Sequence, residues 1–148
     1  MPISTLAKKL AKQHGTRNPF RIASDLGYII IETPLTGVRG YYQYIEQCHI
    51  IYLDSRLTDQ ERLWVCAHEL GHSILHRGLN RIFMDTHTHM ISNRCELEAD
   101  RFAVDLLFSD EDLKPLLEFS TPTVANILGV SLELAKYRMA RLLNDSDT

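Results

Sequence analysis

The sequence predicts an α+β fold with a short antiparallel sheet packed on helices. Three β-rich runs are confined to residues 28–53, and helical periodicity fills the chain before and after them. Strands and helices do not alternate, as they would in a parallel α/β sheet. Because 148 residues suit one domain with a real core, we expect a single domain over residues 1–148, with a C-terminal helical pair at 121–143 as part of it.

Two helices are predicted before the strands. Ser4 can cap the first helix, which Gly15 ends. Asn18 and Pro19 are typical of the cap and first turn of a second helix over residues 20–26. The strands follow at residues 28–32, 37–45 and 48–53. A tight connection at Glu46-Gln47 favours an antiparallel meander.

The rest of the chain is predicted to be helical. Thr58 and Glu61 form the pattern of a capping box for a central helix that reaches Gly78. A looser stretch over residues 79–90 separates it from a helix over 93–108. Three shorter helices are expected to begin near Ser109, Thr121 and Ser131, the last ending near Leu143.

Composition and charge exclude several classes of protein. Lys and Arg number 16 against 19 Asp and Glu, a net charge of −3, so nothing favours direct binding of nucleic acid or of an anionic membrane. The longest apolar runs are of strand length, too short to cross a bilayer. Three widely spaced cysteines do not suggest a secreted disulfide framework. We therefore expect a cytoplasmic protein.

Five of the seven histidines fall between His68 and His89, and two of them belong to an H-E-x-x-H motif. His68 and His72 are one helical turn apart on one face, so both imidazoles can bind one ion. Zn²⁺ favours such ligands, and Glu69 on the rim of that face can act as general base. The alternative is a helix that carries two histidines by chance, but the position within a capped central helix favours the metal site.

A third ligand must come from elsewhere. The longer H-E-x-x-H-x-x-G-x-x-H motif would place a histidine where this chain has Gly78. His76 lies about 12 Å along a straight helix from His68, whereas zinc–nitrogen bonds are about 2.1 Å long. His76 is therefore excluded as a ligand beside both histidines, and we expect it to pack, to stabilise the helix end or to face the substrate.

Carboxylates on the next helix are the candidates. Glu96 and Asp100 are four residues apart and share a face. Glu96 can therefore bind zinc while Asp100 accepts a hydrogen bond from a ligating histidine and so orients its ring. Two alternatives remain open: Glu96 as a capping partner of Asn93, and Asp100 in a solvated ion pair with an arginine. Glu98 is the reserve ligand.

Other residues near these motifs have weaker indications. Residues 37–44 form a candidate edge strand for an extended substrate, with Tyr42 and Tyr44 as possible substrate-binding residues or as ordinary half-buried sheet residues. His87 and His89 are expected in a loop or lid, and Cys66 in the core.

These motifs also resemble a known family. The run IIYLDSRLTDQERLWVCAHELGHSILH (residues 50–76), followed by ELEADRFAVDLL (96–107), is similar to the ImmA/IrrE metallo-endopeptidases, which belong to the gluzincin class. The resemblance implies a small zincin-like domain with Zn²⁺ held by His68, His72 and Glu96, and Glu69 as catalytic base. It further implies cleavage of a helix-turn-helix transcriptional repressor of a phage, mobile element or stress response, often encoded nearby.

A binding module is the rival interpretation. Residues 123–143 have the pattern of a helix-turn-helix, and Lys136, Arg138 and Arg141 could form a weak basic stripe. In that case the chain would bind DNA or a repressor, and its metal site would be structural. The net charge of −3 disfavours DNA.

Overall fold

The computed structural model describes residues 1–76 and 89–146, and the α+β class is confirmed. The chain divides into two compact units, Met1–Leu107 and Phe108–Thr148. The expectation of one domain over the whole chain remains a prediction. Most of the loop predicted at residues 79–90, including His87, lies outside the described residues.

The first unit opens with helices α1 (Ile3–His14) and α2 (Pro19–Asp25). Helix α1 begins one residue before Ser4, and no side chain caps it, so the predicted Ser4 cap is wrong. Gly15 ends the helix with φ 65°, a left-handed conformation that favours glycine. Asn18 caps α2 as predicted, since its side chain accepts a hydrogen bond from the Phe20 amide at 2.9 Å.

The sheet contains β1 (Ile29–Thr33), β2 (Gly40–Ile45) and β3 (Cys48–Asp54) in the order β1-β3-β2. Strands β2 and β3 form the predicted antiparallel hairpin, whose turn residues Glu46 and Gln47 both have positive φ. Strand β1 instead pairs in parallel with β3. The prediction of a wholly antiparallel meander is therefore wrong. After β1, residues 34–39 lead to β2 at the opposite edge of the sheet. The central position beside β1 is then taken by β3, whose Ile51 and Leu53 are fully buried.

Helices α3 (Asp59–Leu75) and α5 (His89–Leu107) complete the first unit. The capping box of Thr58 and Glu61 starts α3 as predicted. The helix ends at Leu75 with His76 as its C-cap, three residues before Gly78. Helix α5 begins four residues before the predicted residue 93, so Asn93 lies inside the helix and is not its cap.

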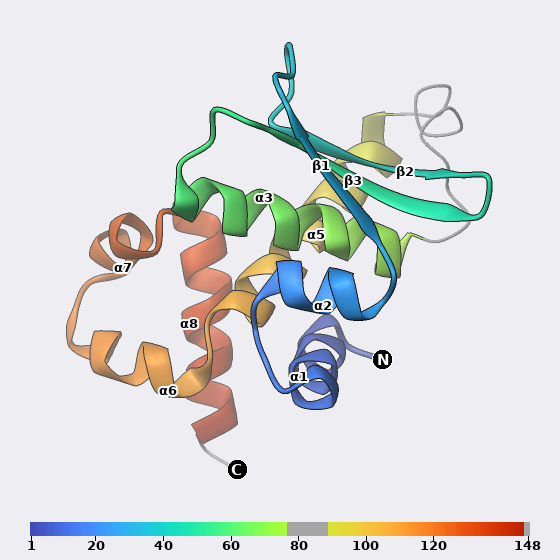
Figure 1. Cartoon of the computed structure of the whole chain (residues 1–148). Coiled ribbons are helices and arrows are strands. Elements are labelled where there is room, and N and C mark those ends of the chain that lie inside the picture. The colour runs from blue at the N-terminus through green and yellow to red at the C-terminus, as the bar shows by residue number, and fades with distance from the viewer. Residues whose placement is uncertain (77–88, 147–148) are drawn as a thin grey trace. The chain divides into compact units, whose positions relative to one another are not determined.

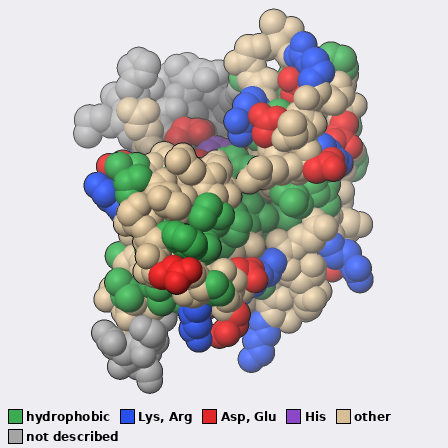
Figure 2. Space-filling view, turned by 90° about the vertical axis from the view of Figure 1, so that its left-hand side faces the viewer, with side chains coloured by type: hydrophobic (Ala, Val, Ile, Leu, Met, Phe, Trp, Pro, Cys, Tyr) green, Lys and Arg blue, Asp and Glu red, His purple; other side chains and the backbone are tan. Residues whose placement is uncertain are grey.

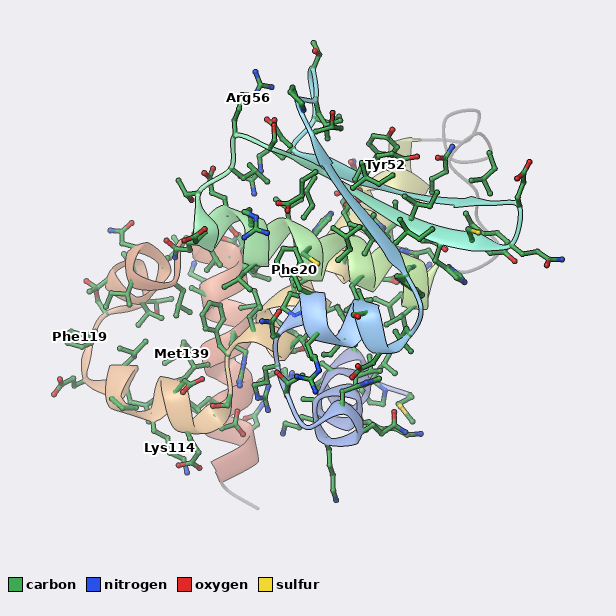
Figure 3. The ribbon with its side chains drawn as sticks, viewed as in Figure 1. Phe20, Tyr52, Arg56, Lys114, Phe119 and Met139 are labelled. Carbon is green, nitrogen blue, oxygen red and sulfur yellow. The ribbon has the colours of Figure 1, made fainter. Side chains whose placement is uncertain are left out.

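Helix α3 lies between the sheet and the other helices of this unit (Figure 1). It contacts β2 and β3 on one side, α5 along its length, and α2, while α1 packs on α5. Figure 3 shows Phe20 between α2 and α3, where it is partly buried against the core. The fully buried core side chains come from all of these layers: Ala7, Ile22, Ala23, Ile51, Leu53, Cys66, Ala67, Leu70, Phe102, Ala103 and Leu106.

Helices α3 and α5 approach each other closely at Gly71. A Cβ atom at this position would lie 2.9 Å from Cδ1 and 3.2 Å from Cβ of Phe102 on α5. A side chain at position 71 would force Phe102 to shift, so glycine allows the backbones of the two helices to lie close together. This approach places the carboxylates of α5 within reach of the histidines of α3.

The second unit is helical, with α6 (Asp110–Leu113), a 3-10 helix η1 (Lys114–Glu118), α7 (Thr121–Leu128) and α8 (Leu132–Ser146). Ser109 and Ser120 cap α6 and α7. Met139 lies on the side of α8 that faces α6 and α7 (Figure 3). It packs there with Leu113, Val124, Leu128 and Leu142.

Within residues 1–76 and 89–146, none of the helices combines the length and the apolar character needed to cross a bilayer.

Candidate metal centre

The H-E-x-x-H motif lies in the second half of α3, on the side that meets α5. The two imidazoles are close, with Nε2 of His68 and Nε2 of His72 3.2 Å apart and the rings at an interplanar angle of 82°. Because the helix repeats every 3.6 residues, positions 68 and 72 point their rings in one direction. The sequence prediction that both imidazoles converge therefore agrees with the geometry.

Glu96 reaches this pair from α5. Its Oε2 lies 2.9 Å from Nε2 of His68, and its Oε1 lies 2.8 Å from Nε2 of His72. In a tetrahedral zinc site with bonds of 2.0–2.1 Å, neighbouring donor atoms are about 3.3 Å apart. The two imidazole nitrogens have nearly this spacing, and each contacts one oxygen of the same carboxylate, so these three side chains could hold such an ion.

Among the residues that the structure describes, Glu96 is the most exposed member of this group. The side chains of His68 and His72 are 14% and 12% exposed, whereas that of Glu96 is 53% exposed. On the face drawn in Figure 2, only a small histidine surface is visible, beside acidic side chains. A catalytic metal site needs an open position for water or substrate, whereas a structural site is closed by four protein ligands.

Glu69 completes the motif. It is buried, with 6% of its surface exposed. Its carboxylate belongs to a group with His68 and His72 whose ligand atoms all lie within 4.8 Å of one another. We favour Glu96 as the third donor because it contacts both imidazoles directly, which leaves Glu69 as an adjacent carboxylate that can take up a proton.

Asp100 lies on the other side of His68. Its Oδ1 is 2.8 Å from Nδ1 of the imidazole, the nitrogen that does not face Glu96. This geometry favours the role of orienting His68 over the alternative of a solvated ion pair with an arginine. The capping alternative for Glu96 is excluded, because Asn93 lies inside α5.

The electrostatics of the group favour a bound cation. Burial opposes protonation of His68, but hydrogen bonds to Asp100 and Glu96 outweigh burial and raise its pKa to about 10. Hydrogen bonds from His68 and His72 lower the pKa of Glu96 well below its usual range, against the smaller effect of burial. Carboxylates that hold a positive charge this strongly in the site also suit a metal ion.

His76 and Glu98 form a second set of contacts that the sequence did not predict. His76 Nδ1 lies 3.1 Å from Nδ1 of His72, and its Nε2 lies 3.1 Å from Oε2 of Glu98. Glu98 also accepts a hydrogen bond from Arg94 at 3.0 Å. The spacing of four residues between His72 and His76 could have indicated their contact. The contact with Glu98 could not be found in this way, because Glu98 lies on another helix.

The two tyrosines predicted for substrate binding belong to an aromatic cluster on the sheet. The Tyr42 hydroxyl lies 2.5 Å from Nδ1 of His49 on β3, and the Tyr44 ring lies 4.7 Å from the His49 ring. Tyr28 stacks on the same imidazole at 4.5 Å. Substrate binding by Tyr42 and Tyr44 remains a prediction.

An H-E-x-x-H motif on a helix is typical of metallopeptidases. Residues 23–140 match the M78 peptidase family, described as the IrrE N-terminal-like domain, and the chain belongs to this family. The matched range includes parts of both compact units.

Two curated relatives extend over most of the chain. An uncharacterized immunity region protein 2 of Bacillus phage phi105 is 35% identical over 136 residues, which are 90% of this chain and 86% of that protein. The metallopeptidase ImmA of Bacillus subtilis strain 168 is 26% identical over 141 residues, 91% of this chain and 82% of ImmA.

Proposed function

We propose that the protein is a zinc-dependent endopeptidase in which His68, His72 and Glu96 hold the ion and Glu69 is the catalytic base. The observation that carries this proposal is the convergence of two imidazole nitrogens, 3.2 Å apart, on the carboxylate of Glu96 beside a buried glutamate. One carboxylate oxygen lies 2.9 Å from His68 and the other lies 2.8 Å from His72. Zn²⁺ in such a site supplies a Lewis acid that makes water a nucleophile near neutral pH.

The protein side chains have distinct tasks in this reaction. Glu69 takes a proton from the attacking water and passes it to the leaving amine. Asp100 holds the ring of His68 in one orientation by its 2.8 Å contact. Strand β2 lies at an edge of the sheet, and its backbone can pair with an extended substrate.

For the substrate, we propose a helix-turn-helix transcriptional repressor in the cytoplasm, encoded close to this protein. The support is the relative from an immunity region of a phage and the similarity to ImmA. A repressor that controls phage, mobile-element or stress-response genes fits both.

Replacing the base separates metal binding from chemistry. Glu69→Gln keeps the size of the side chain but cannot accept the proton, so we expect the variant to retain zinc and lose cleavage by at least about 100-fold. The measurement is cleavage of the neighbouring repressor on a gel, with zinc content from atomic absorption. A chelator should abolish cleavage by the unmodified protein, and added Zn²⁺ should restore it.

Glu111→Gln is the matched control, since Glu111 is an exposed glutamate of the second unit that pairs with Lys114. It should cleave at the normal rate. Undiminished cleavage by Glu69→Gln would exclude the proposed base. Full zinc occupancy after Glu96→Ala would assign the third ligand to another group.

A repressor- or DNA-binding module with a structural metal is the second candidate. Helices α7 and α8 are joined by Gly129 in a left-handed conformation, a short turn that suits a helix-turn-helix. However, Arg138 of the predicted basic stripe is only 1% exposed and pairs with Asp110 at 2.6 Å. A salt-dependent shift of duplex DNA by the full chain would favour this candidate over the peptidase.

A further inference from the structure

We propose that His76 and Glu98 are positioning residues that fix the tautomer and the ring orientation of His72. The inference rests on the proposed function in one respect, namely that His72 binds the metal through Nε2. It assigns to His76 the role of orienting a metal ligand, whereas the sequence left three roles open: packing, stabilising the helix end or facing the substrate.

His72, His76 and Glu98 form a series of contacts that leads away from the metal site. His72 uses Nε2 toward Glu96, at 2.8 Å, and Nδ1 toward Nδ1 of His76, at 3.1 Å. His76 continues through Nε2 to Glu98 at 3.1 Å. The His76 side chain is only 7% exposed, and both of its ring nitrogens have protein partners in this chain.

The positions of the protons follow from the metal-binding nitrogen. A neutral imidazole that binds a metal through Nε2 carries its proton on Nδ1, so His72 must donate to His76. Nδ1 of His76 is then the acceptor, and its proton must lie on Nε2, from which it is donated to the carboxylate of Glu98. Each of the three groups therefore has one defined role.

Glu98, the last residue in this series of contacts, is itself held by an arginine. Nε of Arg94 donates to the other oxygen of Glu98 at 3.0 Å, four residues earlier on the same helix. Arg94 is 81% exposed, whereas Glu98 is 28% exposed. Glu98 is therefore held by an exposed cation on one side and can accept from His76 on the other.

The two imidazoles of the H-E-x-x-H motif are supported differently. His68 contacts the carboxylate of Asp100 directly, at 2.8 Å. His72 contacts a neutral ring, and the carboxylate lies one residue farther away. Outer partners of ligating histidines typically change metal affinity 10- to 100-fold, so the loss of either should be measurable.

The test compares His76→Ala with His76→Asn in the full chain. We expect His76→Ala to weaken binding of Zn²⁺ about 10- to 100-fold in competition with a chelating dye, because His72 loses its acceptor. Asn places an amide oxygen close to the position of Nδ1 and should recover most of the affinity. The visible spectrum of bound Co²⁺ should change in His76→Ala and return in His76→Asn, and circular dichroism checks that each variant is folded.

Controls separate this role from general effects. His14→Ala removes a histidine that pairs with Asp25 instead, and it should bind Zn²⁺ normally. Glu98→Ala should weaken binding in the same direction as His76→Ala, since it removes the acceptor of His76.

The outcomes distinguish the inference from the proposed function. Unchanged affinity and Co²⁺ spectrum in His76→Ala overturn the inference alone, provided that His72→Ala abolishes binding. Equal weakening of Zn²⁺ binding in His76→Ala and His76→Asn also overturns it, since the loss would then come from a change at the end of α3 and not from the missing acceptor. If His72→Ala binds Zn²⁺ as well as the unmodified chain, the proposed site fails and the inference fails with it.

Discussion

The three cysteines lie in different surroundings. Cys48 is exposed at the start of β3, while Cys66 on α3 and Cys95 on α5 are 0% and 5% exposed. Burial raises the pKa of the Cys66 thiol to about 12, and burial also raises that of Cys95. Since the thiolate is the reactive form, Cys66 is ionised in only about one molecule in 10⁴ at pH 8.

We therefore expect one fast-reacting thiol per folded chain with a disulfide reagent at pH 8, measured by absorbance of the released thiolate. Three should react after unfolding in guanidinium. Cys48→Ser should remove the fast phase entirely. Three fast-reacting thiols in the folded chain would contradict the burial of Cys66 and Cys95.

Single residues of the site were predictable to different degrees. The spacing of His68 and His72, and of Glu96 and Asp100, is a property of one helix each, and helical geometry is enough to pair them. The contact of His76 with Glu98 depends on how α3 and α5 lie against each other. Helical spacing carries no such information, so only the exclusion of His76 as a direct ligand could be derived from it.

At the scale of elements, the close approach of α3 and α5 at Gly71 controls the site. We expect Gly71→Ala to lower the free energy of unfolding by about 1–2 kcal/mol, because overpacking against Phe102 outweighs the gain in helix propensity. It should also weaken binding of Zn²⁺, since α5 carries Glu96. Urea unfolding and the dye competition measure the two effects.

A double variant tests whether Phe102 is the cause. Phe102→Leu makes room beside position 71, so Gly71→Ala should lower the free energy of unfolding less in that background than in the unmodified chain. If the two substitutions change the free energy of unfolding additively, the contact between positions 71 and 102 is contradicted. A coupling free energy of about 1 kcal/mol would support it.

Elements with local signals were predicted more closely than those without. The capping box of Thr58 and the Asn18 cap set the starts of α3 and α2 correctly. The start of α5 was wrong, since Asn93 imitates a cap inside the helix. The parallel pairing of β1 was missed because alternation identifies a strand but not its neighbour.

Each of the two compact units carries a residue that can report on its unfolding. The single tryptophan, Trp64, lies in the first unit, while Arg138 lies in the second. The Arg138 guanidinium donates to the Phe108 carbonyl at 3.0 Å and to Asp110 at 2.6 Å. We expect Arg138→Ala to lower the free energy of unfolding by about 2–4 kcal/mol, because it removes a buried guanidinium and its hydrogen bonds to the Phe108 carbonyl and to Asp110.

If residues 1–148 form one cooperative domain, Trp64 fluorescence and circular dichroism should give the same urea midpoint, and Arg138→Ala should shift both. Lys136→Ala, at an exposed position of the same helix, should shift neither by more than about 0.5 kcal/mol. A shift in circular dichroism with no shift of the Trp64 midpoint would show that the units are separate domains.

The strand order has a consequence for synthesis of the chain. The first strand, β1, pairs with β3, the last of the three to be made, and Ile29 faces a partner, Ile50, that lies twenty-one positions later. At 5–20 residues per second, a ribosome needs roughly 1–4 s to supply that length of chain. During this interval the run Ile29-Ile30-Ile31 must wait without its partner strand. A hairpin joined by two residues, such as β2–β3, closes in about 1–10 μs. We therefore expect β1, the first of the three strands to be translated, to pair after the hairpin has formed.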